Sequence, residues 1–227
     1  MTIFERALEF VADGDGVGLG TGRAAGEFIK LLAGRVRAGL RVRGVPTSRG
    51  SEDLARGLGV PLVSLEEAFP LALTVDGADE VAPNLDLIKG WGRALVREKV
   101  VAACSRRLII LVGTNKAVPK LGARGKLPVE VIPFALPLCR RRLSELGCTP
   151  VLYEQEGKPF VTDNGNQILD CAVGPIDDPA GLEARLRAVP GVVGTGLFLG
   201  MADTVLFGDE GDGFRLVEEQ RRQPVED

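Results

Sequence analysis

The 227-residue sequence contains no histidine, one tyrosine, one tryptophan and four well-separated cysteines. The absence of histidine excludes Ser-His-Asp and Cys-His catalysis and histidine metal sites. The cysteines form no C-x-x-C pair, so we expect buried, reduced thiols in a cytoplasmic protein. Asp, Glu and Lys are left as the realistic carriers of a proton near neutral pH.

The sequence also lacks an excess of positive charge and any long apolar run. Lys and Arg number 28 against 31 Asp and Glu, a net charge of −3, which disfavours nucleic acid as a partner. The first ten residues, MTIFERALEF, do not have the pattern of a signal peptide. No apolar run approaches the ~20 residues that span a bilayer. We therefore expect a cytoplasmic protein with neither a membrane nor a nucleic-acid partner.

Short apolar runs alternate with helical patterns through the first half of the chain. This alternation predicts crossover connections, and hence an α/β fold with a doubly wound, mainly parallel sheet covered on both faces. The predicted strands are Val17–Leu19, Leu40–Val45, Leu71–Val75 and Leu108–Val112, and the predicted helices are Ala24–Ala38, one capped by Ser51, and Arg93–Cys104.

The pattern changes after Lys126. The run Asp163-Asn164-Gly165-Asn166 is a strong hairpin signal between predicted strands Phe160–Thr162 and Gln167–Asp170. With helices at Leu136–Leu146 and Pro179–Ala188, and strands at Val129–Ile132 and Val192–Phe198, this favours a smaller, inserted α+β domain over residues 126–199. Residues 1–125 and 200–227 then form the large catalytic domain, ending in strands Met201–Phe207 and Phe214–Val217, the turn Gly208–Gly213 between them, and a frayed tail, Glu218–Asp227.

A glycine-rich turn, Gly18–Ala25, joins the first predicted strand to the first helix. Bare backbone N–H groups at a helix N-terminus favour a phosphate. The segment from Gly20 to Ala25 also fits the relaxed dinucleotide pattern G-x-G-x-x-A, and Arg41 and Arg43 would suit NADP. A tight turn without a ligand is the third interpretation.

Asp76 and Asp79 follow a fully apolar strand, separated by Gly77 and Ala78. Ligands bind at the carboxyl ends of parallel strands, so these carboxylates can approach one small ligand. Such pairs occur in acid–base sites and in magnesium sites, and a solvated acidic turn remains the simpler alternative.

Lys89 precedes a second glycine-rich turn, Gly90-Trp91-Gly92, which opens a helix carrying Glu98. The residues three and four positions from Glu98 are all apolar, so burial would raise its pKa toward the range of a general base. A glutamate at the edge of the apolar stripe, reaching water, fits the spacing equally well. Lys116 ends another strand, where a solvated loop lysine is the default interpretation.

Together, these stretches resemble the A-type ribose-5-phosphate isomerases. The matching runs are Gly18–Gly22, Thr74–Val81 (TVDGADEV), Pro83–Lys99 (PNLDLIKGWGRALVREK), Pro128–Pro133 (PVEVIP), Phe160–Asp170 (FVTDNGNQILD) and Met201–Asp203. The resemblance implies reversible conversion of ribose 5-phosphate to ribulose 5-phosphate in the pentose phosphate pathway. It also implies that neither a metal nor a cofactor is needed, and that the protein is a homodimer or a higher homo-oligomer.

By the same resemblance, Glu98 is the proton acceptor. Asp76, Asp79 and Lys89 surround the reacting carbons and help to open the sugar ring. The residues implied in substrate binding are Thr21, Gly22, Arg23, Ala24, Gly77, Ala78, Gly90, Trp91, Gly92 and Lys116.

The sequence departs from the family pattern at the phosphate contacts. The usual G-T-G-S-T reads Gly20-Thr21-Gly22-Arg23-Ala24, the usual K-G-G-G contains Trp91, and the N-terminus is too short for a lysine that often holds the phosphate. We predict that Arg23 takes over this contact, with Arg49 as the rival donor. Two other functions stay open: a non-catalytic sugar-phosphate sensor and an NADP-dependent reductase.

Overall fold

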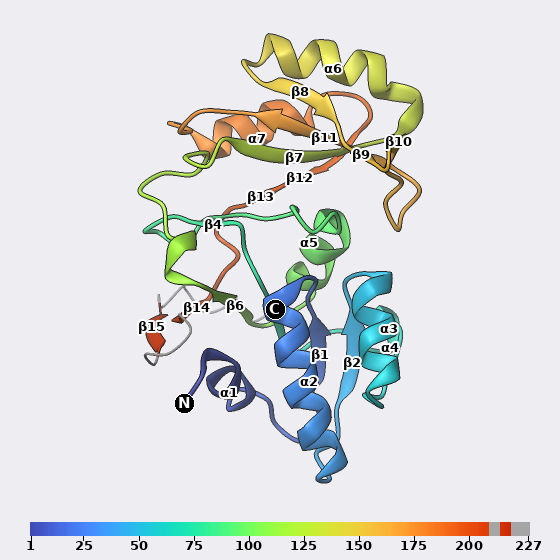
Figure 1. Ribbon diagram of the computed structural model, residues 1–227, viewed down its shortest axis with the longest axis vertical. Coiled ribbons are helices and arrows are strands. Elements are labelled where there is room, and N and C mark those ends of the chain that lie inside the picture. Colours follow the sequence, from blue (N-terminus) through green and yellow to red (C-terminus); the bar gives the residue numbers. More distant parts are fainter. Residues whose placement is uncertain (209–213, 219–227) are drawn as a thin grey trace.

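The computed structural model describes residues 1–208 and 214–218, and its central element is a six-stranded sheet (Figure 1). The strand order is β15-β14-β6-β3-β1-β2, and only the edge strand β15 is antiparallel to its neighbour. The expected parallel sheet is therefore confirmed. Its strands are β1 (Gly16–Leu19), β2 (Arg43–Pro46), β3 (Leu73–Asp76), β6 (Leu108–Val112), β14 (Thr204–Gly208) and β15 (Phe214–Glu218).

Helices cover both faces of this sheet. Alternate residues of a strand point to opposite sides, so neighbouring residues of β6 show what packs on each face. Ile109 belongs to a core that contains Phe28 of α2 (Arg23–Arg37). Its neighbour Ile110 belongs to a different core, together with Ala102 of α5 (Leu95–Ala103). Both faces of β6 are thus buried, which is the doubly wound arrangement that the sequence predicted.

The cap of α3 differs from the prediction. The helix begins at Arg49, and its N-cap is Ser48 rather than Ser51. Ser48 Oγ accepts from Ser51 N (3.1 Å), and Ser51 Oγ accepts from Ser48 N (3.0 Å). The two serines form one capping box, and the sequence pattern identified its second member. The helix α3 spans Arg49–Gly57, and the remaining α-helices of the described residues are α1 (Ile3–Leu8), α4 (Leu65–Ala68), α6 (Leu136–Glu145) and α7 (Pro179–Arg187).

A second, four-stranded antiparallel sheet lies at the opposite end of the molecule from α1 and α2 (Figure 1). Its core includes Leu143 of α6 and Leu186 of α7, so both helices pack on this sheet, as predicted. We call it the small sheet. In the order β12-β7-β11-β8, its strands are Val192–Thr195, Lys126–Val131, Gln167–Ala172 and Thr149–Leu152.

The predicted hairpin around Asn164-Gly165 is wrong. Phe160–Thr162 is not a strand, and the hairpin present is formed by β9 (Glu154–Gln155) and β10 (Lys158–Pro159). Thr162, Asn164 and Asn166 instead each donate a side-chain hydrogen bond to Glu130 Oε1, at 2.9–3.2 Å. These three side-chain hydrogen bonds to one buried carboxylate hold the segment as a loop, in place of the backbone hydrogen bonds of a hairpin.

The predicted strand Val192–Phe198 is two strands that belong to different sheets. β12 ends at Thr195, and β13 (Leu197–Phe198) pairs with β5 (Leu87–Ile88), which also pairs with β4 (Glu80–Val81). Between them, a Cβ on Gly196 would lie 2.4 Å from Lys89 O, so this crossing requires glycine.

The large-domain and small-domain boundaries remain a prediction. Apart from Gly208 and Glu218, the predicted turn Gly208–Gly213 and tail Glu218–Asp227 lie outside the described residues. Within the described part of the chain, no helix has the length and apolar character needed to cross a membrane.

Candidate active site

A cleft of about 310 Å³ lies at the carboxyl ends of β1, β3 and β6. Each of these parallel strands ends at the same edge of the sheet, so the segments that follow them converge there. The lining residues are Thr21, Gly22, Arg23, Ala24, Gly77, Ala78, Asp79, Lys89, Gly90, Gly92, Glu98, Leu111, Val112, Gly113, Asn115 and Lys116.

Asp76 ends β3 and is buried at the base of this cleft. Its Oδ1 accepts hydrogen bonds from Thr21 N (3.1 Å) and Gly77 N (2.7 Å). A Cβ on Gly20 would lie 2.4 Å from the Asp76 carboxylate, so the first glycine turn packs directly on this acid. Asp76 therefore fixes the position of the glycine turn relative to β3.

Lys89 joins two buried carboxylates. Its Nζ lies 3.0 Å from Asp76 Oδ2 and 3.4 Å from Glu98 Oε2, and donates a hydrogen bond to Gly77 O at 2.5 Å. All three charged side chains are 3% exposed or less. Burial opposes the charge of Lys89, but Asp76 and Glu98 together outweigh it and raise the pKa of the ammonium. Lys89 is thus a permanent cation between two acids.

Glu98 lies in the first turns of α5, and its side chain is 3% exposed. The pKa of Glu98 is raised to about 8, mainly by burial; the ammonium of Lys89 acts to lower it, and the negative charges of Asp76 and Asp79 act to raise it. Among the described residues, Glu98 Oε2 has no hydrogen-bond partner, and its contact with Lys89 is ionic. The buried interpretation of Glu98 is therefore confirmed over the solvated one. A carboxylate in this state can take up a proton near neutral pH.

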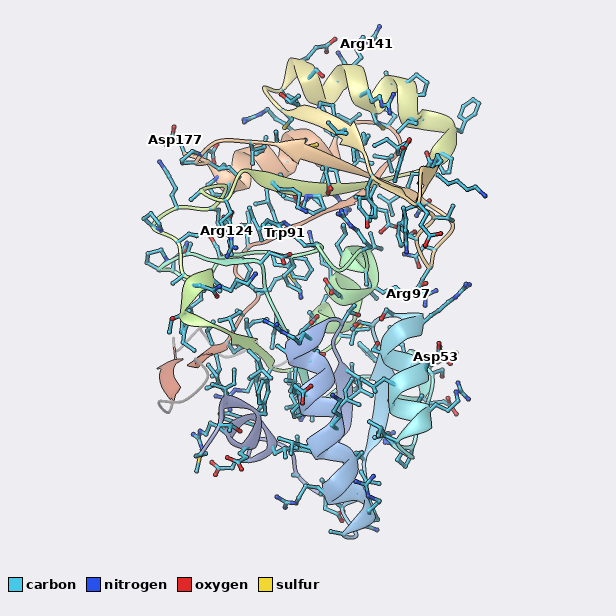
Figure 2. The ribbon with its side chains drawn as sticks, in the orientation of Figure 1. Asp53, Trp91, Arg97, Arg124, Arg141 and Asp177 are labelled. Atoms are coloured by element: carbon cyan, nitrogen blue, oxygen red, sulfur yellow. The ribbon has the colours of Figure 1, made fainter. Side chains whose placement is uncertain are left out.

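Asp79, the second of the two acids that follow β3, contacts the second glycine turn. Its Oδ2 accepts from Trp91 N (2.9 Å), and burial raises the pKa of its carboxyl. The Trp91 ring does not line the cleft; it packs among Lys116, Arg124 and Lys126, whose charged groups lie 5.5, 5.4 and 4.3 Å from the ring centre. Figure 2 shows Trp91 and Arg124 side by side, between the small sheet and β6.

Positive charge gathers at one side of the cleft. Arg23 is exposed and begins α2, whose N-cap Gly22 provides no side-chain cap. Partial burial, then the nearby guanidinium groups of Arg124 and Arg23, lower the pKa of Lys116. Arg49 does not line the cleft, and its backbone N donates to Asp163 Oδ2 (2.7 Å). The geometry therefore favours Arg23 over Arg49 as an anion contact.

The cleft contains every predicted site residue except Asp76, which lies beneath it, and Trp91, which faces the three cations. Sequence reasoning did not single out Arg124, whose guanidinium lies, like the ammonium of Lys116, over the Trp91 ring. It also did not assign Asn115 a role, although that residue lies within the stretch that drew attention to Lys116. Within residues 1–208 and 214–218, no group of three or more Cys, Asp or Glu side chains is arranged to hold a metal ion.

Comparison with known proteins gives consistent results. The family model for Ribose 5-phosphate isomerase A (phosphoriboisomerase A) matches residues 43–212. The chain is 51% identical over 211 residues to the ribose-5-phosphate isomerase A of Roseiflexus castenholzii. The matched region covers 91% of this chain and 90% of the relative. The similarity thus extends over nearly the whole of both sequences.

Two solved structures have the same fold. Ribose 5-phosphate isomerase A from Methanocaldococcus jannaschii is 39% identical with a TM-score of 0.90, over 96% of this chain and 97% of that one. A D-ribose-5-phosphate isomerase in complex with phospho-erythronic acid is 38% identical with a TM-score of 0.91, over 95% and 96% of the two chains. The similarity in structure therefore covers both the central sheet and the small sheet.

Proposed function

The chain belongs to the ribose 5-phosphate isomerase A family, and we propose that it interconverts D-ribose 5-phosphate and D-ribulose 5-phosphate with Glu98 as the general base. The observation that carries the proposal is the state of Glu98, a buried carboxylate in the cleft wall, 3.4 Å from the Lys89 ammonium. The relative in complex with phospho-erythronic acid supports a phosphorylated sugar as the ligand class.

The reaction moves one proton between adjacent carbons of the open-chain sugar. Glu98 removes the proton from C2. The C2–H electron pair forms the C1–C2 double bond, and the π pair of the carbonyl moves to O1, which gives an enediolate. Return of the proton to C1, with transfer of the O2 hydroxyl proton to O1, gives the ketose. A base with a pKa of about 8 can both accept and return the proton near neutral pH.

The charged residues beside Glu98 each have a role in this proposed reaction. Lys89 stabilises the negative charge that develops on the enediolate oxygens, because it is a fixed cation in a site shielded from water. Asp76 holds that cation in place at 3.0 Å. Asp79, whose pKa is raised by burial, can exchange a proton with the ring oxygen or the C1 hydroxyl when the furanose opens. The phosphate end then lies toward Arg23 and Lys116.

We further propose that the enzyme acts in the pentose phosphate pathway in the cytoplasm, without a metal or cofactor, and as a homodimer or higher homo-oligomer. These assignments rest on the family. Size-exclusion chromatography with light scattering tests the last of them, and a monomer at micromolar concentration would contradict it.

The direct test of function is ketose formation from ribose 5-phosphate by the purified protein, in the presence of a chelator. Appearance of ribulose 5-phosphate at an undiminished rate after chelation supports the proposal. No ketose, or a rate restored only by a divalent ion, contradicts it. A change in nicotinamide fluorescence on mixing with NADPH would instead favour the reductase interpretation.

We expect the activity to depend on the ionisation of Glu98. Since the base acts as the carboxylate, kcat/KM should increase about tenfold per pH unit up to about pH 8 and then level off. Lys89 stays protonated over this range, because its pKa is raised. The measurement is kcat/KM for ribose 5-phosphate from about pH 6 to about pH 9. A profile that is flat across this range would show that the pKa of the base lies elsewhere.

We expect Arg23→Ala to raise KM for ribose 5-phosphate about tenfold or more, with a smaller effect on kcat. Arg23 lies at the start of a helix, where backbone N–H groups already favour an anion, and a guanidinium there adds charge-assisted hydrogen bonds. Turnover of unphosphorylated ribose should scarcely change. Arg49→Ala is the matched control and should leave KM nearly unaltered. An equal loss with both sugars would remove Arg23 from the phosphate site.

A further inference from the structure

Arg93 has an unusual backbone conformation at the junction between the second glycine turn and α5. Its φ is 69°, in the left-handed region, and its N–H donates to Gly90 O at 3.0 Å. A residue with a Cβ rarely adopts this region, so neighbouring contacts must hold it there. Those contacts come from Asp170 of the small sheet and from Tyr153, the residue that follows β8.

The Arg93 guanidinium forms a two-point ion pair with Asp170. Nη1 lies 2.6 Å from Oδ1 and Nη2 lies 3.0 Å from Oδ2, and the side chains are 11% and 19% exposed. The same guanidinium stacks on Tyr153, 3.4 Å from the ring centre. A guanidinium that is hydrogen-bonded along its edge and stacked on its face has a fixed orientation as well as a fixed position.

Asp170 is a rigid anchor for this pair. It lies in β11, where it is paired with Pro128 of β7 on one side and with Val151 of β8 on the other. The anchor therefore moves only with the small sheet as a whole.

Arg93 in turn precedes the helix that carries Glu98. The N-cap residue of α5, Ala94, provides no side-chain cap, and Glu98 N donates to Ala94 O at 3.0 Å. Since no side chain of its own caps the helix, its first turn depends on neighbouring contacts for its direction.

We propose that the Arg93–Asp170 pair positions Glu98, so that the small sheet sets the place of the base relative to Lys89 and the substrate. Arg93 and Asp170 are positioning residues in this account, which rests on the proposed role of Glu98. The small sheet is then part of the catalytic apparatus, although none of its strand residues lines the cleft among the described residues.

The test compares two carboxylate-to-amide changes that each weaken an ion pair between α5 or its entry turn and the rest of the molecule. Asp170→Asn weakens the Arg93 pair, and Glu183→Gln weakens the pair with Lys99 (3.3 Å, side chains 21% and 22% exposed). We expect Asp170→Asn to lower kcat about tenfold with KM changed less than about threefold, and Glu183→Gln to keep kcat within about twofold. A merely structural role would lower kcat equally in both variants.

Arg93→Gly is the second variant, and it decides the question if Asp170→Asn does not fold. Glycine accepts the left-handed conformation without strain, and this change leaves the 3.9 Å contact between Lys126 and Asp170 in place. It should also lower kcat about tenfold.

Retention of more than about half of wild-type kcat in the folded Asp170 or Arg93 variant overturns the inference, as does an equal loss in Glu183→Gln. Glu98→Gln, assayed in parallel, separates the two proposals. If Glu98→Gln stays active, the assignment of the base fails and this inference fails with it. If Glu98→Gln is inactive while Asp170→Asn is unaffected, only the positioning role is overturned.

Discussion

Glu98→Gln is expected to lower kcat by about 10²–10⁴ while the fold and substrate binding stay nearly intact. The amide has the shape of the carboxylate but cannot accept the C2 proton. We expect the fold to persist, because Lys89 keeps Asp76 as its counter-charge at 3.0 Å when Glu98 becomes neutral. KM for ribose 5-phosphate and the unfolding temperature, measured beside kcat, separate loss of the base from loss of structure.

Glu130→Gln is the matched control for this experiment. Glu130 is a fully buried acid outside the cleft, and its Oε1 accepts three side-chain hydrogen bonds that a glutamine oxygen can also accept. We expect it to keep most of the wild-type kcat. If Glu98→Gln kept more than about a tenth of wild-type turnover, Glu98 would not be the base.

Lys89→Met should abolish most of the activity and also destabilise the protein. Loss of the cation that faces the enediolate should cost about 10²–10³ in kcat. It also leaves Asp76 and Glu98 buried without their common counter-charge, and removal of one partner from a buried ion pair typically costs about 3–5 kcal/mol of unfolding free energy.

The destabilisation in Lys89→Met should depend on pH. Lys89 lowers the pKa of Glu98, so its loss moves the folded-state pKa further above the ordinary value of 4.5. A group whose folded-state pKa is raised binds protons more tightly in the folded state, so its contribution to stability is lost as pH rises. Denaturant unfolding at about pH 6 and about pH 9 should therefore show a larger deficit at the higher pH.

Lys99→Met is the control for the lysine. Both ammonium groups lie over the Phe198 ring, at 5.4 Å for Lys89 and 4.9 Å for Lys99, but Lys99 does not line the cleft. We expect Lys99→Met to keep kcat within about threefold. A deficit for Lys89→Met that does not change with pH would show that burial of unpaired carboxylate charge is not its cause.

Local patterns predicted the elements more reliably than their exact ends. The helix expected at Arg93–Cys104 is Leu95–Ala103, because Arg93 is held in the left-handed region by its contacts with the small sheet. The strand expected at Val192–Phe198 divides at Gly196 for a similar reason: the chain leaves one sheet for another where Lys89 O approaches closely. Periodicity reports which residues are apolar, but it does not report which sheet they join.

The sequence by itself determined the chemistry available and the edge of the sheet at which it would gather. A chain without histidine has carboxylates and lysines for proton transfer, and the positions of Asp76, Asp79 and Lys116 after apolar strands follow from short-range alternation. The glycine turns could be predicted for the same reason, since the residues that form a turn are neighbours in the chain.

Only the tertiary structure decided which charges meet. The spacing of Glu98 fitted a buried and a solvated side chain equally, and its burial depends on Lys89 and Asp76 arriving from two other segments. The Arg93–Asp170 pair joins residues that are 77 positions apart, and the cations of Lys116, Arg124 and Lys126 meet over the ring of Trp91, which comes from another segment. A pKa depends on all the charges and the desolvation around a group, whatever their distance in the sequence, so local pattern could not fix it.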